Sequence, residues 1–323
     1  MILCGLRATA IVALGLAILT LPRHDAQDTG LVVSMPQEVP RGTCWVFTHL
    51  NKAGGTTIKG LLDKWSERYN TTLGAYTGGL WREGSQGAKE YWSEGYMVTT
   101  GGYAETLRSI GAAECKWFTT LRQPVTRLVS AYMYCRRPRG RDQLCGYSFA
   151  DAHKVDIATF AEHWGNYGMR QFALAFVLPD VVLNSTLAKE CPRCPSWYLV
   201  KDYLRQEYAT EGDAVDEGMI RFIEPVKELI ANNYTAVGIL EDFNSTLHLF
   251  NRALGIPGMD WPEYSRTYGA RNTMNAEYEE AKREVLKAAE GDPRIKNFLR
   301  LDFMLYDYAL SIHQEQLLQY GLA

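Results

Sequence analysis

The stretch VFTHLNKAGGTTIKGLL, Val46–Leu62, decides the fold of this chain of 323 residues. A β-rich run comes first, a pair of glycines follows, and apolar residues then recur at helical spacing as Ile58, Leu61, Leu62 and Trp65. Strand, glycine turn and helix in this order form a cradle for phosphate groups. The lysine comes before the glycines, whereas the loop that binds nucleoside triphosphates places it after them. The stretch therefore predicts an anion site of a different kind.

The residues of this turn suit an oxyanion. Gly54 and Gly55 permit positive φ and a close approach of the backbone to a ligand. Thr56 and Thr57 open the helix, where hydroxyl groups and unsatisfied N–H groups face an anion. Lys52 lies on the strand side of the glycines, and its side chain can reach a group one atom beyond the oxyanion that the helix start binds. A Gly-Gly turn with a threonine cap is also ordinary punctuation between a strand and a helix, so this stretch alone leaves both interpretations open.

A second stretch, WFTTLRQPVTRLVSAY at 117–132, repeats the strand-to-helix pattern. Arg122 ends the strand, Pro124 suits the first turn of a helix, and Ser130 follows eight residues after the arginine. If the helix folds back past the strand end, the forked arginine and the serine hydroxyl converge on one phosphate. The alternative is that Arg122 pairs with a surface acid and Ser130 is an ordinary helix residue.

Further β-rich runs alternate with helical patterns along the chain. The strands are expected at 96–100, 116–121 and 235–240, and the helices at 56–69, from 124 onward, at 241–255, 276–290 and 296–319, with Pro293 in the break between the last two. This alternation predicts the α/β class, with a P-loop-like parallel β-sheet that is flanked by helices on both faces.

The amino-terminal segment is apolar. Ala8–Leu21 contains fourteen apolar or small residues after Arg7, fewer than the about 20 that a spanning helix needs. No good small-x-small cleavage site follows, so we expect residues 1–22 to be an uncleaved type II signal anchor, with a cleaved signal peptide as the alternative. Residues 23–42 lack periodicity and are expected to form a stem, which leaves residues 43–323 as a single domain.

The glycosylation sequons, together with an even number of cysteines after the apolar segment, agree with a secreted or lumenal chain. Asn-x-Ser/Thr sequons stand at four positions, which predicts N-glycosylation at Asn70, Asn184, Asn233 and Asn244. The formal net charge of −3 excludes a globally basic nucleic-acid binder, although it leaves room for a local basic groove.

Six cysteines follow the apolar segment, and an even number in an oxidising compartment predicts disulfides. The pairs closest in sequence are Cys135–Cys145 and Cys191–Cys194. The CPRC motif of the second pair is alternatively half a zinc site or a redox pair. Because no second CxxC motif occurs, a structural bridge is the preferred interpretation.

Taken together, the two strand-to-helix stretches resemble the Golgi carbohydrate sulfotransferases. HLNKAGGTT is similar to the family pattern H-x-P-K-T-G-G-T-[ST], and LRQPVTRLVSAY to L-R-D-P-v-x-R-x-x-S-x-Y. Weaker resemblance covers most of residues 43–310 and includes NYGMRQFAL (166–174), VGILEDFNSTL (237–247) and LDFMLYDYA (301–309). Within this family, the pattern is similar to that of the heparan sulfate 2-O/6-O-sulfotransferases and of related uronyl or chondroitin/dermatan-type enzymes. In this family, the segment that contains Asn166, Arg170 and Gln171 lies near the donor and the acceptor.

The resemblance implies the donor 3′-phosphoadenosine 5′-phosphosulfate, a single sulfotransferase domain and a Golgi membrane location with that domain in the lumen. Its 3′-phosphate would be bound by Arg122 and Ser130, and its 5′-phosphosulfate by Lys52, Ala53, Gly54, Gly55, Thr56 and Thr57. Negative charge grows on the bridging phosphate oxygen during transfer, and a lysine ahead of the glycines is placed to stabilise it. No metal is expected, because the loop amides and Lys52 already supply the positive electrostatic field that stabilises the phosphate charge.

The catalytic base is the part of the family pattern that is missing. Relatives often carry a histidine just after the second strand, where this chain has TTGGYAETL at 99–107, with Gly102 or Tyr103 at the histidine position. Tyrosine stays protonated near neutral pH. Glu105 is the nearest carboxylate and is the candidate base if burial raises its pKa. The alternative for Glu105 is a solvated acid at the start of a helix. His49, inside the loop motif, is expected to support the loop.

A run of arginines follows the second motif. The segment RRPRGR is suited to grip the sulfate and carboxylate groups of a glycan through Arg136, Arg137, Arg139 and Arg141. A solvated basic loop is the alternative. The expected function is therefore transfer of a sulfuryl group to a glycan hydroxyl. The first alternative is a non-catalytic donor- or glycan-binding member of the same fold. A P-loop kinase is less favoured, because this chain has no G-x-x-x-x-G-K-[ST] motif.

Overall fold

One parallel sheet organises the computed structural model, which describes residues 44–69, 97–101, 115–136, 154–176, 217–269 and 276–323. Its strands are β1 (Cys44–Thr48), β2 (Met97–Gly101), β3 (Lys116–Leu121) and β4 (Tyr234–Ile239). They lie side by side in the order β2-β1-β3-β4, and each neighbouring pair is parallel. The α/β class and the parallel sheet expected from the sequence are confirmed.

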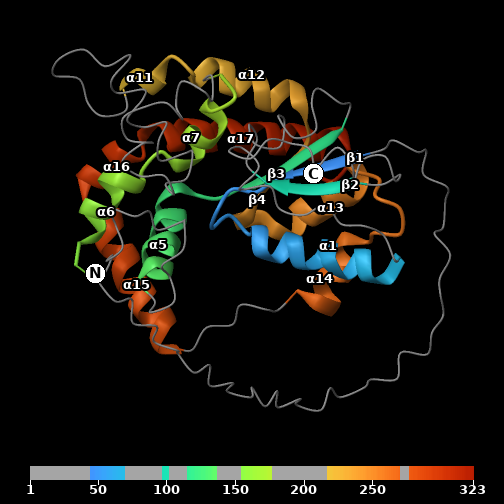
Figure 1. Ribbon diagram of the computed structural model, residues 1–323, viewed down its shortest axis with the longest axis horizontal. Coiled ribbons are helices and arrows are strands. Elements are labelled where there is room, and N and C mark those ends of the chain that lie inside the picture. The colour runs from blue at the N-terminus through green and yellow to red at the C-terminus, as the bar shows by residue number, and fades with distance from the viewer. Residues whose placement is uncertain (1–43, 70–96, 102–114, 137–153, 177–216, 270–275) are drawn as a thin grey trace, which may run out of the picture. The chain divides into compact units, whose positions relative to one another are not determined.

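The strand order places the ends of β1 and β3 at a topological switch point. From β1 the chain moves to β2 on one side, and the next strand, β3, lies on the other side of β1 (Figure 1). Thr48, the last residue of β1, pairs with Thr119, two residues before the end of β3. In sheets of this kind, ligands bind beyond the carboxyl ends of the strands at this point. The two sequence motifs are the segments that follow these two strand ends.

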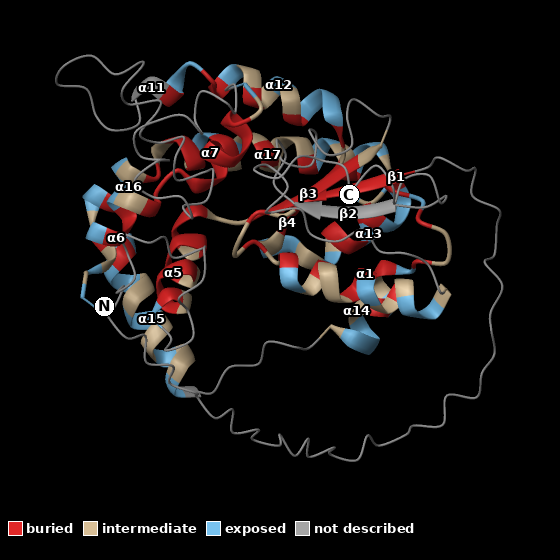
Figure 2. Cartoon of the chain, in the orientation of Figure 1, coloured by how far each residue is buried: buried red, intermediate tan, exposed pale blue. Residues whose placement is uncertain are grey.

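Helices cover both faces of the sheet. Trp45 and Phe47 pack on one face against α1 (Gly55–Tyr69), α13 (Phe243–Ala253) and α14 (Trp261–Tyr268). Cys44 and Val46 belong to a second cluster on the other face, with α5 (Pro124–Cys135), α7 (Tyr167–Ala173), α12 (Ile223–Asn233) and α17 (Arg300–Gln319). Figure 2 shows β1 and β3 buried between these layers. Burial on both faces explains why the strands are almost continuously apolar or threonine-rich.

The carboxyl-terminal helices differ from the expected pair. The structure has α15 (Ala276–Gly291), a short α16 (Pro293–Phe298) and then α17. Pro293 begins a helix instead of only interrupting one, because Asp292 caps the N–H of Arg294 and proline fits the first helical position. The remaining elements are α6 (Ile157–Trp164), α11 (Glu217–Ile220) and a 3₁₀ turn, η1 (Leu240–Asp242).

A disulfide joins Cys44 at the start of β1 to Cys115, the residue before β3. Neither cysteine was paired by the sequence analysis, because they are 71 residues apart and meet only through the adjacency of the two strands. Cys135 is also disulfide-bonded. Its expected partner Cys145 and the pair Cys191–Cys194 lie outside the described residues.

The free edge of β4 is closed by side chains of α17. The side-chain oxygen of Gln316 accepts the N–H of Val237 at 2.8 Å, and Nδ1 of His313 donates to the Val237 carbonyl at 2.8 Å. These bonds replace those of a further strand and protect the sheet edge. All described residues belong to one compact unit, Val33–Ala323. Within them, no helix combines the length and apolarity of a membrane span, and the expected anchor at 1–22 lies outside them.

Candidate functional site

The loop after β1 is a tight turn held against the neighbouring strand. Lys52 has φ of 66° and Gly54 has φ of 86°, so both adopt the left-handed conformation. For lysine this conformation costs roughly 1–2 kcal/mol, a strain that is concentrated at functional sites. The N–H of Ala53 donates to the Leu50 carbonyl at 3.2 Å, and the Thr120 hydroxyl of β3 donates to the Ala53 carbonyl at 2.6 Å. The turn is therefore anchored to β3.

The two glycines of the loop are needed for different reasons. A Cβ atom on Gly54 would lie 2.8 Å from Cδ1 of Leu240, and its positive φ adds strain for any other residue. Gly55 has no positive φ, contrary to the expectation from the sequence. Its Cβ atom would instead lie 1.9 Å from Cδ2 of His49, so glycine is required there by close packing.

The amino terminus of α1 presents unused donors. The N–H groups of Thr57 and Ile58 donate to the Gly54 carbonyl at 3.0 and 3.2 Å. Among the residues that the structure describes, none accepts from the N–H groups of Gly55 and Thr56. The side chain of Thr56 is exposed as well. Two free N–H groups at the positive end of a helix dipole are donors of the kind that binds anions.

Arg122 of the second motif contacts the backbone of the first motif. Arg122 donates through Nη1 to the Lys52 carbonyl at 3.2 Å and through Nε to the Thr126 hydroxyl at 3.1 Å. Nζ of Lys52 lies 4.3 Å from the ring centroid of Tyr134. Thr126, Ser130 and Tyr134 are four residues apart on α5 and therefore share one face of the helix. Ser130 thus stands between the contact made by Arg122 and the contact made by Lys52.

Arg122 has a carboxylate neighbour that the sequence analysis did not identify. Its Nε lies 3.9 Å from Oε1 of Glu241, which follows β4 at the same edge of the sheet. Burial lowers the pKa of Arg122, and the charge of Glu241 acts in the opposite direction. The alternative of an acidic partner for Arg122 is therefore realised, together with its contact to the loop. The sequence signal was the position of Glu241 directly after a strand end.

His49 forms a wall of the loop. Its ring is half-buried and stacks on Phe47 with 5.9 Å between the centroids. Burial, and then repulsion by Lys59 and Lys52, lowers the pKa of His49 to about 4. The ring is therefore neutral at neutral pH and does not add to the charge of the loop. Lys59, on the second turn of α1, is a nearby cation that the sequence analysis missed.

The segment 166–174 contacts α6 and α17, and one of its residues contacts the loop after β1. Asn166 has φ of 52°, and its side-chain oxygen accepts the N–H groups of Leu301 and Asp302 at 3.0 Å, which caps α17. Arg170 and Gln171 are buried, and Arg170 donates to the His163 carbonyl at 2.9 Å. These contacts of Asn166 and Arg170 join the segment to α17 and α6 and do not involve the two loops.

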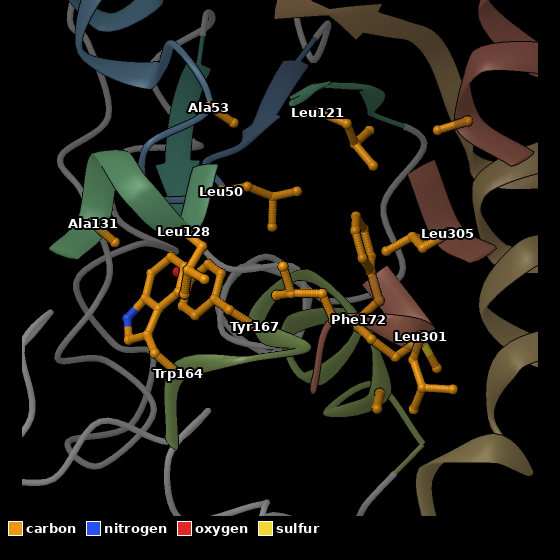
Figure 3. Close-up of a cluster of buried hydrophobic side chains, with 14 of the residues drawn as sticks. Leu50, Ala53, Leu121, Leu128, Ala131, Trp164, Tyr167, Phe172, Leu301 and Leu305 are labelled. Carbon is orange, nitrogen blue, oxygen red and sulfur yellow. The ribbon is translucent and has the colours of Figure 1, made fainter. Parts of the chain in front are cut away.

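Tyr167 connects this support to the loop. Its hydroxyl accepts a hydrogen bond from the side chain of Asn51 at 2.7 Å. Leu50 and Ala53 of the loop belong to the same buried cluster as Tyr167, Leu128 and Leu121 (Figure 3). The loop therefore rests on the hydrophobic core, which keeps its strained turn in place.

Several predicted residues lie outside the described part of the chain, namely Glu105, Gly102, Tyr103, Arg137, Arg139, Arg141, Asn70 and Asn184. Arg136 is exposed at the end of α5, with its guanidinium 5.3 Å from the ring centroid of Tyr132. Asn233 and Asn244 are exposed, as a glycosylated asparagine has to be, and their modification stays a prediction. Within the described ranges, no group of three or more His, Cys, Asp or Glu residues is placed to hold a metal ion.

Comparison with known proteins does not assign this site. A scan against protein-family models and a search of curated proteins both gave no match. The assignment of a function therefore depends on the geometry of the two loops and on the resemblance of their motifs.

Proposed function

We propose that this protein is a carbohydrate O-sulfotransferase that uses 3′-phosphoadenosine 5′-phosphosulfate as donor and a glycan hydroxyl as acceptor. One observation carries the proposal. The two segments that resemble the family's donor motifs follow the strands at the switch point, and Arg122 of one donates to the Lys52 carbonyl of the other at 3.2 Å. A P-loop-like sulfotransferase fold, the finer version of the observed α/β class, is part of this proposal.

The residues present fit a ligand with two separate anionic groups. The N–H groups of Gly55 and Thr56 and the ammonium of Lys52 suit the 5′-phosphosulfate. Arg122 and Ser130, at the end of β3 and on α5, suit the 3′-phosphate. A Cβ atom on Gly54 would clash with Leu240 and one on Gly55 with His49, so the shape of this loop requires glycine at both positions.

The donor supplies an activated sulfuryl group when it is bound. The helix terminus of α1 orients the phosphate, and Lys52 offers a proton donor to the phosphate oxygen that becomes negatively charged. The acceptor hydroxyl has to lose its proton to a base. Glu105 remains the predicted base, and it lies outside the described residues.

The acceptor and the compartment are further parts of the proposal. A sulfated or carboxylated glycan fits the arginine run that begins with the exposed Arg136 at the end of α5. The disulfide between Cys44 and Cys115 supports an oxidising compartment such as the Golgi lumen. Residues 1–22 would anchor the protein in the Golgi membrane.

The proposal is tested with the full chain, labelled donor and a panel of desulfated glycans. We expect transfer to at least one glycan, loss of transfer in Lys52→Ala, and wild-type behaviour in Lys64→Ala, a lysine of α1 that pairs with Glu67. Donor binding without transfer to any glycan would support a non-catalytic member of the fold. Affinity for ATP with Mg²⁺, combined with none for the donor, would support the kinase and overturn the proposal.

A further inference from the structure

The amino terminus of α5 is closed by groups of the chain itself. The side chain of Gln123 accepts the N–H of Thr126 at 2.8 Å, and Pro124 has no N–H to offer. The N–H of Gln123 donates to the carboxylate of Glu241, with N–O distances of 3.1 and 3.2 Å. Of the first N–H groups at this terminus, only that of Val125 has no acceptor among the described residues, so an anion at this end of the site depends mainly on side chains, in particular Arg122.

Glu241 links this helix start to two other elements. The hydroxyl of Tyr306 on α17 donates to Oε2 of Glu241 at 3.1 Å, and Nε of Arg122 lies 3.9 Å from Oε1. Both carboxylate oxygens are therefore engaged on the protein side. Burial, and then the charge of Glu241, raises the pKa of Tyr306, so its hydroxyl remains a donor.

These contacts leave one nitrogen of Arg122 for a ligand. The Nε side faces Thr126 and Glu241, and Nη1 donates to the Lys52 carbonyl. Among the described residues, none accepts from Nη2. A guanidinium that is held on two sides loses less conformational freedom when it binds a phosphate.

We propose that Glu241 is a positioning residue for the second anionic group of the ligand. It closes the start of α5 to that group and holds Arg122 with Nη2 free to receive it. This inference rests on the proposed function, because it takes the second group to be the 3′-phosphate of the donor. Glu241 acts through Arg122 and does not touch the ligand.

The test compares two ligands that differ only in that phosphate. Calorimetry measures the dissociation constants of adenosine 3′,5′-bisphosphate and adenosine 5′-monophosphate for the full chain, for Glu241→Gln and for Glu263→Gln. Glutamine keeps a neutral acceptor for Gln123 and Tyr306 but removes the attraction to Arg122. Glu263, exposed on α14, is the control for the loss of one charge.

We expect Glu241→Gln to weaken binding of the bisphosphate about three- to fivefold, the range for a partly exposed ion pair, and to leave binding of the monophosphate unchanged. Tyr306→Phe, which removes a hydrogen bond to Glu241, shifts the ratio of the two constants in the same direction by less. If the role of Glu241 were purely structural, Glu241→Gln would weaken the binding of both ligands equally. If Glu241→Gln leaves the ratio of the two dissociation constants unchanged, or binds the bisphosphate more tightly, the inference is overturned and the proposed function is not. If the wild-type chain binds neither ligand, the proposed function is overturned and the inference with it.

Discussion

The helices α1 and α5 both begin after strands at the switch point, and they treat an anion in opposite ways. At the start of α1, the N–H groups of Gly55 and Thr56 have no acceptor among the described residues. At the start of α5, Glu241 accepts the N–H of Gln123, the side chain of Gln123 accepts the N–H of Thr126, and Pro124 has no N–H, so only the N–H of Val125 is without an acceptor among the described residues. One loop thus offers backbone donors and the other offers the side chain of Arg122. A strand-to-helix turn can offer backbone donors to an anion only where its own chain leaves those donors unused.

The largest effect is expected from closing the α1 terminus sterically. In Gly55→Ala the new Cβ atom would lie 1.9 Å from the His49 ring, so we expect a loss of about 3 kcal/mol in the free energy of unfolding, at the upper end for overpacking. Adenosine 3′,5′-bisphosphate should then bind too weakly to measure. Denaturant unfolding and calorimetry check both effects.

The matched control is Gly291→Ala on α15, where a Cβ atom meets nothing within 4 Å. It should leave stability and binding near the wild-type values. Combining Gly55→Ala with His49→Ala should restore part of the stability. If the single variant at Gly55 is as stable as wild type, the close packing of His49 is wrong.

A second prediction concerns pH and the neutral His49. The unfolded chain takes up a proton at this residue near pH 6.5, whereas the folded chain takes it up only near pH 4, so stability falls as the pH falls through this window. Between about pH 7.5 and about pH 5 the loss from this residue is about 2 kcal/mol. Denaturant unfolding of wild type and His49→Gln across this range isolates it. If the free energies of unfolding of the two proteins change with pH in the same way, the neutral state of the half-buried His49 ring is contradicted.

A third prediction separates strain from binding at Lys52. Lys52→Gly removes the left-handed strain of a lysine, so stability should be unchanged or higher by up to about 1 kcal/mol. Binding of adenosine 3′,5′-bisphosphate should weaken about tenfold, because a charged hydrogen bond is lost. Unfolding and calorimetry measure the two changes separately. If Lys52→Gly is less stable than wild type but binds the bisphosphate with unchanged affinity, Lys52 stabilises the fold and does not bind the ligand.

The smallest effect is expected at the closed helix. Gln123→Ala removes the acceptor for the Thr126 N–H and should lower the free energy of unfolding by about 1 kcal/mol, as for other helix caps. Affinity for the bisphosphate should not fall, because Arg122 and Ser130 are untouched. A large loss of affinity without a loss of stability would mean that the α5 terminus itself takes part in binding.

The local elements of this fold were predictable. Helix α1 begins one residue before the expected Thr56, and β3 has the expected bounds, because both depend on apolar spacing over a few residues. The sequence predicted only that Arg122 and Ser130 would converge if the helix folds back past the strand end. The hydrogen bond from Arg122 to the Lys52 carbonyl was not predicted, because it joins residues 70 positions apart. The support of α17 by Asn166 had no local signal, because a left-handed residue that caps a helix 135 residues away leaves no periodic pattern.

Periodicity and turn chemistry predicted the strands, the glycine loop with a lysine ahead of it, and the helices α1, α5, α13, α15 and most of α17. They did not predict α6, α7, α12 and α14. Only the tertiary structure decided which strand ends meet, and therefore that Lys52, Arg122 and Glu241 share one edge of the sheet. It also decided that the α1 terminus stays open while the α5 terminus is closed. The physical reason is that secondary structure depends on neighbours a few residues apart, whereas strand order sets contacts between residues separated by 70 or more.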